Sequence, residues 1–313
     1  MEIAINIGLT ILGIVMLCYG GHFLVEGGVR IANHFRISSL VIGMTVVAYG
    51  TSTPELAASI AAAGQHTQLI LGNVVGSNIT NIGMVIGISA ILVPLVVQKT
   101  TIRKEIPIMI GASLLLIALS LDNGISQWEG GLLIACLIAF TYYVYRNAKK
   151  QRADNSQKIE ESVGKSFFTG AIGLAVLGIG LLWGGAILTV DNAVVIAESF
   201  DVSERIIGLT IIAIGTSLPE LITSVIAIRK GHHDIGIGNI IGSNIYNVLM
   251  IIGVASAIGG IVVIPEVFID YVVMIGFSFV LLVVLKTGLI GKPMGIGLVA
   301  AFAAYLGWLL IFP

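Results

Sequence analysis

Two glutamates lie in stretches of the chain that are otherwise apolar. Glu55 ends the sequence Gly-Thr-Ser-Thr-Pro-Glu, and Glu220 ends Gly-Thr-Ser-Leu-Pro-Glu at the matching point of the second half. An ionisable side chain at membrane depth is costly, so such a residue indicates a functional site. Carboxylates, hydroxyls and backbone carbonyls are hard oxygen ligands, which suit sodium, calcium or magnesium and are poor for soft metals. The paired motifs therefore predict a site for hard cations.

The spacing of other polar residues brings further oxygen ligands to the same site. Each glutamate follows a threonine by four residues, and residues four apart share a helix face: Thr51 with Glu55, and Thr216 with Glu220. Two later blocks, GNVVGSNITN and GNIIGSNIYN, repeat this spacing: Ser77 with Asn81, and Ser243 with Asn247. The proline before each glutamate removes a helix hydrogen bond. We therefore expect a helix break at Thr51-Ser52 and at Thr216-Ser217, with carbonyl oxygens freed there.

Structural roles are the alternative for each of these residues. A single buried glutamate could be protonated and hydrogen-bonded, but two at equivalent positions beside helix breaks favour a site. Ser77 and Ser243 could bond to the backbone of their own helices, and Asn73 and Asn239 fit equally well as ligands or as packing contacts. No Lys or Arg lies at the depth of the glutamates inside the helices that carry the motifs. The two negative charges would be matched by one divalent cation, or by protons or monovalent ions.

The composition is that of an integral membrane protein. Of 313 residues, 57% are hydrophobic and 11% are charged, whereas soluble domains carry roughly 25% charged residues. A membrane-spanning helix needs about 20 apolar residues, and the segments lack the alternation of barrel strands, so an all-α protein is predicted. Ten spans are expected, at about 4–25, 39–63, 70–93, 105–121, 127–146, 166–190, 204–228, 236–259, 267–285 and 293–312.

The two halves of the chain form an internal repeat. The glutamate motifs are offset by 165 residues and the serine–asparagine blocks by 166. Residues 1–146 form the first five-helix repeat, 147–165 a hydrophilic linker loop, and 166–313 the second repeat. Because each half has an odd number of helices, the second half is expected to insert upside down. Inverted repeats of this kind are typical of transporters that work by alternating access.

The basic residues predict the orientation. Fifteen of the sixteen Lys and Arg residues fall on one side of the predicted helices, with Arg205 as the exception. The positive-inside rule makes that side cytoplasmic. We therefore expect a multi-pass protein of the cell (inner) membrane, with linker 147–165 in the cytoplasm and both termini outside. The net charge of −1 gives no electrostatic basis for nucleic-acid binding, and a monomer that needs no protein partner is the simplest expectation.

The paired motifs resemble the two α-repeats of the sodium/calcium exchanger family, within the cation/Ca²⁺ exchanger superfamily. The resemblance covers essentially the whole chain, and the short central loop is similar to that of prokaryotic members. It implies secondary active exchange of Ca²⁺ for Na⁺ by alternating access, with no enzymatic activity and no cofactor. It also implies a central Ca²⁺ site and flanking Na⁺ sites, whose ligands would be Glu55, Glu220, Thr51, Thr216, Ser52, Ser217, Ser77, Ser243, Asn81 and the carbonyls near Ala48 and Ala213.

One position departs from the family pattern. Many members have an aspartate in the second repeat where this chain has Asn247, so both halves of the site end in asparagine. The site then carries one acid fewer, which leaves the stoichiometry and the coupling ion open. Exchange of Ca²⁺, or another divalent cation, for H⁺ is therefore the alternative, although the GTS-x-PE wording favours sodium.

Two other functional classes are less well supported by the sequence. A cation channel is disfavoured because the chain carries its own two-fold repeat and needs no ring of subunits. An intramembrane enzyme is disfavoured because the chain has no His-Glu-x-x-His motif and its acids lack a paired nucleophile and base. For an exchanger, the glycine-rich spans 4–25 and 166–190 are the elements expected to slide against the rest.

Overall fold

The computed structural model describes residues 2–63, 67–155, 165–200, 211, 213–285 and 287–311. Within these residues the chain is helical, apart from four strands of two residues each. Six described helices are long and apolar enough to cross a membrane: Ile3–Phe35, Leu69–Leu92, Gln127–Lys150, Thr169–Glu198, His233–Gly259 and Lys292–Ile311. Shorter apolar helices cover Ser39–Thr51 and Val267–Val283. The predicted class, an all-helical membrane protein, is confirmed.

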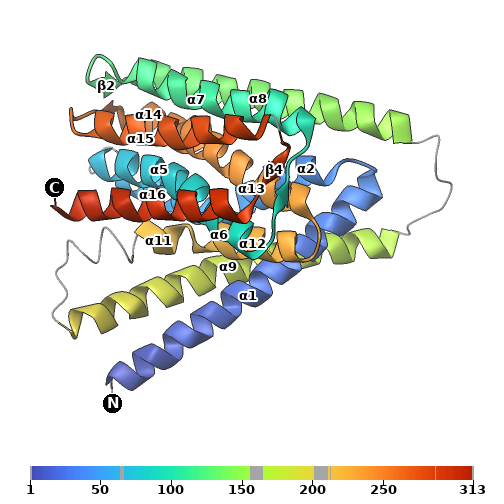
Figure 1. The fold of residues 1–313 in the computed structure, drawn as a ribbon, viewed down its shortest axis with the longest axis horizontal. Coiled ribbons are helices and arrows are strands. Elements are labelled where there is room, and N and C mark those ends of the chain that lie inside the picture. Colours follow the sequence, from blue (N-terminus) through green and yellow to red (C-terminus); the bar gives the residue numbers. More distant parts are fainter. Residues whose placement is uncertain are drawn as a thin grey trace.

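Helices α1 (Glu2–Phe35) and α9 (Lys165–Glu198) lie side by side at one edge of the bundle (Figure 1). Both continue beyond the spans predicted for them. Glycines bring their backbones together: a Cβ atom at Gly20 would lie 2.9 Å from the carbonyl oxygen of Gly178. A Cβ atom at Gly13 would lie 2.8 Å from the carbonyl oxygen of Gly185. Larger side chains here would force the two helices apart, as at other close contacts between membrane helices.

The motif-bearing helices form the centre of the bundle. In the first half they are α2 (Ser39–Ile42), η1 (Gly43–Val47), α3 (Ala48–Thr51), α4 (Thr53–Ala62), α5 (Thr67–Thr80), η2 (Asn81–Ile86) and α6 (Gly87–Leu92). In the second half they are α11 (Ala213–Thr216), α12 (Leu218–Arg229), α13 (His233–Tyr246), η5 (Asn247–Ile252) and α14 (Gly253–Gly259). The start of the expected span 204–228, with Arg205, lies outside the described residues.

Both predicted helix breaks are confirmed. The backbone dihedrals leave the α-helical range at Ser52 (φ −87°, ψ 5°) and at Ser217 (φ −93°, ψ 4°). Pro54 and Pro219 then lie in the first turn of the next helix, where a missing N–H leaves no hydrogen bond unmade. Each break therefore starts a new helix just before its glutamate.

Two wide turns occur at equivalent points of the repeat and were not predicted. The π-helical segments η2 and η5 begin at Asn81 and Asn247, the last residues of the two serine–asparagine blocks. Such turns are rare inside α-helices and occur frequently at functional sites. They shift the register of the helix at the two asparagines.

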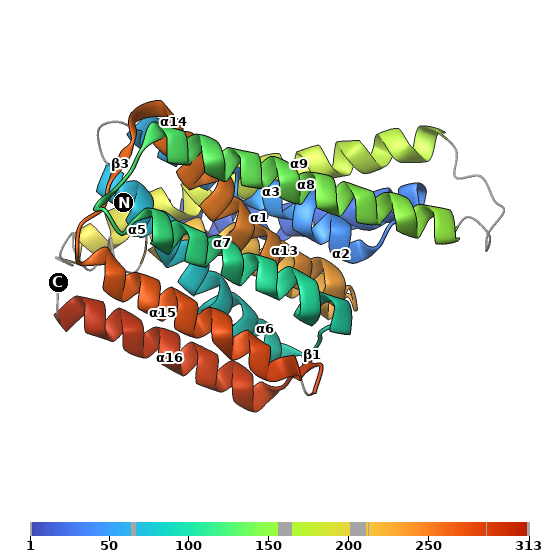
Figure 2. The same cartoon turned by 90° about the horizontal axis from the view of Figure 1, so that it is seen from above.

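The remaining helices form an outer row, seen side by side in Figure 2. In chain order they are η3 (Thr101–Glu105), α7 (Ile106–Leu119), α8 (Gln127–Asn155), α15 (Val267–Val280), η6 (Leu281–Leu285) and α16 (Lys292–Ile311). Helix α8 extends to Asn155, into the predicted linker 147–165.

Short strand pairs join the two halves at opposite ends of the bundle. Strand β1 (Leu95–Val96) pairs antiparallel with β4 (Leu289–Ile290), and β2 (Gly124–Ile125) pairs antiparallel with β3 (Ile261–Val262). Figure 1 shows β4 and β2 at opposite ends. These pairs were not predicted. They satisfy loop backbone groups that would otherwise lack partners.

Candidate cation site

The two glutamates lie at the centre of the bundle, each in the first turn of the helix that follows a break. The exposed fractions of Glu55 and Glu220 are 2% and 1%, and their carboxylates are close enough to repel each other. The helix N-termini beneath them partly offset that negative charge. No described Lys or Arg forms an ion pair with either residue; the ion pairs of the described residues are those of Glu26, on α1, with His22 and Arg30. One oxygen of each carboxylate, Oε2, is buried and makes no hydrogen bond within the described chain.

Two predicted serines contact Glu220 directly. The hydroxyl of Ser52 lies 3.0 Å from Glu220 Oε1 and 3.0 Å from Ser243 Oγ. The hydroxyl of Ser243 lies 3.5 Å from the same carboxylate oxygen. The structure thus brings together residues from both halves. The hydroxyl of Ser243 contacts these side chains rather than a carbonyl of its own helix.

The serines equivalent to these two, Ser217 and Ser77, differ from them. Ser77 and Ser217 are 3% and 0% exposed, and their hydroxyl oxygens make no hydrogen bond within the described residues. A buried hydroxyl without a partner costs free energy. On one side of the site the hydroxyl of Ser52 is therefore hydrogen-bonded. On the other side the buried hydroxyls of Ser77 and Ser217 make no hydrogen bond within the described residues.

Four buried asparagines form a reciprocal cluster between the two serine–asparagine blocks. The side-chain amide of Asn81 donates to Asn244 Oδ1 at 2.9 Å, and that of Asn247 donates to Asn78 Oδ1 at 3.1 Å. The amides of Asn78 and Asn244 donate in turn to each other's backbone carbonyls, at 3.3 and 3.4 Å. Each hydrogen bond donated by the first half to the second therefore has a counterpart donated by the second half to the first.

The cluster fixes the orientation of the two predicted ligands. Because the NH₂ groups of Asn81 and Asn247 are used in these bonds, their carbonyl oxygens point elsewhere. Both Oδ1 atoms are buried and accept no hydrogen bond from the described residues. Amide oxygens of this kind are suitable ligands for Ca²⁺. Asn78 and Asn244 were not predicted as functional residues, although the repeated Gly-Ser-Asn triplets contain the signal.

We predict that Asn78 acts by positioning Asn247. In an Asn78→Ala variant, the amide of Asn247 loses its acceptor and can rotate, so calcium uptake is expected to fall about 10- to 100-fold, the usual cost of losing an outer-shell partner. Uptake of radiolabelled Ca²⁺ into proteoliposomes would measure this. Ser278→Ala is the matched control, because that buried hydroxyl bonds only to the carbonyl of Met274 in its own helix. Equal uptake by both variants would refute the positioning role.

Thr51 is held by a residue whose role the sequence left open. The Thr51 hydroxyl donates to Asn239 Oδ1 at 3.1 Å, and the Asn239 amide donates to Ser224 Oγ at 2.9 Å. Asn239 is thus a packing and hydrogen-bonding partner of the glutamate helices. The side chain of Thr51 faces this network, so its contribution to a cation would come from its backbone oxygen.

Backbone carbonyls close to the predicted ligand positions accept hydrogen bonds at both breaks. The Ala48 oxygen accepts from the Ser52 N–H at 3.0 Å and from the Thr51 hydroxyl at 3.3 Å. In the second half, Ser217 N–H bonds to the carbonyl of Ile214 at 3.1 Å. Thr216, half-buried, ends α11 immediately before the break.

Burial differs between the two ends of the site. On α13, Gly238 and Gly242 approach the first half so closely that added Cβ atoms would lie 2.8 Å from Leu40 O and 2.7 Å from Met44 Cα. Asn239, between them, is fully buried. The equivalent positions on α5 are more open, since Gly72 is exposed and Asn73 only half-buried. The α5 side of the site is therefore less buried than the α13 side.

Comparison with known proteins places these features in one family. A family model described as "Sodium/calcium exchanger protein" matches residues 5–146 and 170–311. The chain is 30% identical over 348 residues to the sodium/calcium exchanger MaX1 of Methanosarcina acetivorans, covering 97% of this chain and 98% of that protein. It is 34% identical over 310 residues to the inner membrane protein YrbG of Escherichia coli, covering 96% and 95%.

A solved structure agrees over nearly the full length. The sodium-calcium exchanger NCX_Mj, soaked with zero Na⁺ and Ca²⁺, superimposes with a TM-score of 0.86 at 31% identity. The match covers 98% of this chain and 99% of that one. Family model, relatives and fold therefore agree across both halves of the chain.

Proposed function

Because the chain belongs to the sodium/calcium exchanger family, we propose that it exchanges Ca²⁺ for Na⁺ across the cell membrane at a site built on Glu55 and Glu220. The family consists of ion exchangers, so the chain is a transporter and not an enzyme. The observation that carries the proposal is the pair of buried carboxylates without a basic partner among the described residues. Two such charges in a low-dielectric site need cations to neutralise them.

The free oxygen atoms support particular ligand roles. A central Ca²⁺ would be held by Glu55 Oε2 and Glu220 Oε2, with Asn81 Oδ1 and Asn247 Oδ1, all four of which lack hydrogen bonds within the described chain. Backbone oxygens of Thr51 and Thr216 would complete it. Na⁺ would bind at flanking positions, with ligands from Ser52, Ser217, Ser77, Ser243 and the carbonyls near Ala48 and Ala213.

Coupling follows from competition for the same charges. Ca²⁺ and Na⁺ cannot both neutralise Glu55 and Glu220, so occupancy by one ion expels the other. The contacts of the Ser52 hydroxyl with Glu220 and Ser243 close one flanking position, whereas the hydroxyls of Ser77 and Ser217 are available at the other. This asymmetry supports a mechanism in which the flanking positions open in turn.

Alternating access is supported by the arrangement of the two halves. We propose ten spans in two inverted repeats, residues 1–146 and 166–313, with linker 147–165 cytoplasmic and both termini outside. In that orientation the more exposed α5 end of the site faces outward. The glycine contacts between α1 and α9 would allow this pair to slide as a unit against the central helices, so that a monomer suffices.

Calcium binding to the purified protein tests the proposal. In isothermal titration calorimetry, Na⁺ is expected to raise the apparent Kd for Ca²⁺ competitively, without changing the number of sites, whereas choline at equal ionic strength should not. A Kd that ignores Na⁺ but rises on acidification would instead support Ca²⁺/H⁺ exchange. Ca²⁺/H⁺ exchange stays a second candidate because position 247 carries an asparagine in place of an acid. A conductance with no saturation by either ion would indicate a channel.

A further inference from the structure

A polar pocket lies between η3, α2 and α8, away from the cation site. It has a volume of ≈ 280 Å³, and its lining includes Glu105, Lys104, Tyr143, Asn147 and Lys150. Glu105 is 5% exposed, and its Oε1 accepts a hydrogen bond from the Tyr143 hydroxyl at 3.4 Å. Its other oxygen, Oε2, is buried with no hydrogen bond in the described chain. A buried carboxylate oxygen without a partner calls for an explanation, and a donor from a ligand in the adjoining pocket would supply one.

The pocket has a negative charge at its buried end and positive charges at its rim. Lys104 and Lys150 are exposed at the rim of the pocket, and no described carboxylate lies within ion-pair distance of either one. A ligand that fits both must carry a positive group with N–H donors at the buried end and a negative group at the rim. The pocket lies at the end of the bundle that we propose is cytoplasmic, where basic residues gather at the membrane surface.

An apolar groove continues from the polar pocket toward the middle of the membrane. It has a volume of ≈ 360 Å³ and shares Tyr143 with the pocket. Its walls are α7 and α8, which both pack on η5, and its floor includes Leu249. On α8 the lining residues Cys136, Phe140 and Tyr143 follow one helix face, which then continues to Asn147 and Lys150 in the polar pocket. Pocket and groove thus meet at Tyr143, with polar lining on one side of it and apolar lining on the other.

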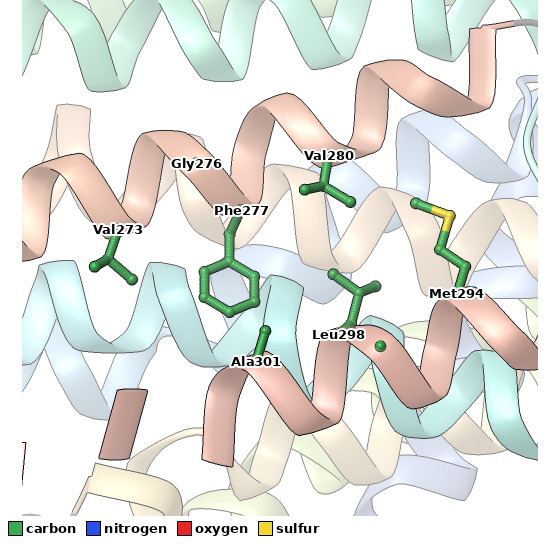
Figure 3. Close-up of a pocket in the computed structure, with 8 residues that line it drawn as sticks. Val273, Gly276, Phe277, Val280, Met294, Leu298 and Ala301 are labelled. Atoms are coloured by element: carbon green, nitrogen blue, oxygen red, sulfur yellow. The ribbon is translucent and has the colours of Figure 1, made fainter. Parts of the chain in front are cut away.

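The equivalent groove in the second half shows which feature is special. It lies between α15 and α16 and is lined by Val273, Gly276, Phe277, Val280, Met294, Gly297, Leu298 and Ala301 (Figure 3). Four of these residues match the α7 lining at an offset of 165. No charged residue lines either apolar groove, so the difference lies in the acid beside each one. The acid equivalent to Glu105, Asp270, also accepts a hydrogen bond from a tyrosine, Tyr305, at 2.8 Å, but unlike Glu105 it has no buried carboxylate oxygen without a partner among the described residues.

We propose that the seam between α7 and α8 binds a phospholipid with a primary-amine headgroup, of the phosphatidylethanolamine class. The ammonium donates to Glu105 Oε2, the phosphate lies between Lys104 and Lys150, and one acyl chain occupies the groove over Gly111 and Ala112. Such charge-assisted hydrogen bonds favour an ammonium over a quaternary amine, which has no N–H to donate. The bound lipid joins the outer helices α7 and α8 to the central segment η5.

Native mass spectrometry of the delipidated full chain tests this proposal. The probes are dioleoyl phosphatidylethanolamine, phosphatidylcholine and phosphatidylglycerol, which share their acyl chains. We expect one tightly retained phosphatidylethanolamine, with about tenfold preference over phosphatidylcholine, from one hydrogen bond to a charged group. Glu105→Gln should remove that preference, and Lys104→Gln with Lys150→Gln should weaken retention of all three lipids.

Groove variants provide the matched control. A Cβ atom at Gly111 or at Gly276 would meet no described atom within 4 Å, so leucine fits at either position without disturbing the fold. Gly111→Leu should lower lipid retention, whereas Gly276→Leu, in the groove between α15 and α16, should not. Equal retention of the three lipids, an unchanged preference in Glu105→Gln, or equal effects of the two leucines would overturn the proposal. So would equally tight binding of free phosphoethanolamine, which has no acyl chain.

Discussion

Replacing either buried glutamate with glutamine is expected to abolish calcium uptake. Glu55→Gln or Glu220→Gln keeps the volume and one oxygen but removes a charge that the cation needs. Breaking a buried charge pair costs about 3–5 kcal/mol, which corresponds to a loss of at least ~100-fold in affinity. The loss should appear in Ca²⁺ uptake by proteoliposomes and in Ca²⁺ binding by calorimetry.

The control for these variants is a glutamate outside the bundle. Glu266 is exposed immediately before α15, so Glu266→Gln should transport normally. The two site variants should also retain a folded protein, because an amide removes the repulsion between the carboxylates. Normal exchange by both Glu55→Gln and Glu220→Gln would refute the site assignment.

The second large effect is expected from Asn247→Asp. A carboxylate cannot donate the hydrogen bond that Asn247 gives to Asn78 Oδ1 at 3.1 Å, and it adds a third negative charge beside Glu55 and Glu220. An unmet buried acceptor costs about 1–3 kcal/mol, so Ca²⁺ uptake should slow by roughly tenfold or more. The added charge should also increase the positive charge that must enter to balance each Ca²⁺ released.

The charge moved per Ca²⁺ can be read from the reversal potential of exchange currents. Asn192→Asp is the control, because Asn192 bonds to the carbonyl of Leu188 in its own helix. If Asn247→Asp changed neither the uptake rate nor the reversal potential, Asn247 would not belong to the site.

The sequence predicted the elements that burial and duplication dictate. Hydropathy alone placed the long helices, because a bilayer requires about 20 apolar residues in each one. The prolines predicted the breaks at Ser52 and Ser217, since a missing N–H is a local property. The contacts of Ser52 and Ser243 with Glu220 were not predicted, although all three residues were expected in one site.

Other features depend on contacts that no local pattern encodes. Asn78 and Asn244 are the same residue type as Asn81 and Asn247. Only the three-dimensional arrangement shows that the first two hold the side chains of the other two, whose amide oxygens stay free of hydrogen bonds within the described chain. The wide turns at Asn81 and Asn247 have no sequence signature of their own. The strand pairs depend on loops from opposite halves meeting, and α1 extended further than hydropathy suggested because it packs along α9.

The central claim is exchange of Ca²⁺ for Na⁺ at the two glutamates. The most direct test is uptake of radiolabelled Ca²⁺ into proteoliposomes loaded with Na⁺, with a pH gradient imposed independently. The account predicts uptake that requires the outward Na⁺ gradient, is unaffected by the pH gradient, and is lost in Glu55→Gln. Uptake driven by the pH gradient and indifferent to Na⁺ would contradict it, and would identify H⁺ as the ion exchanged at a site that ends in Asn247.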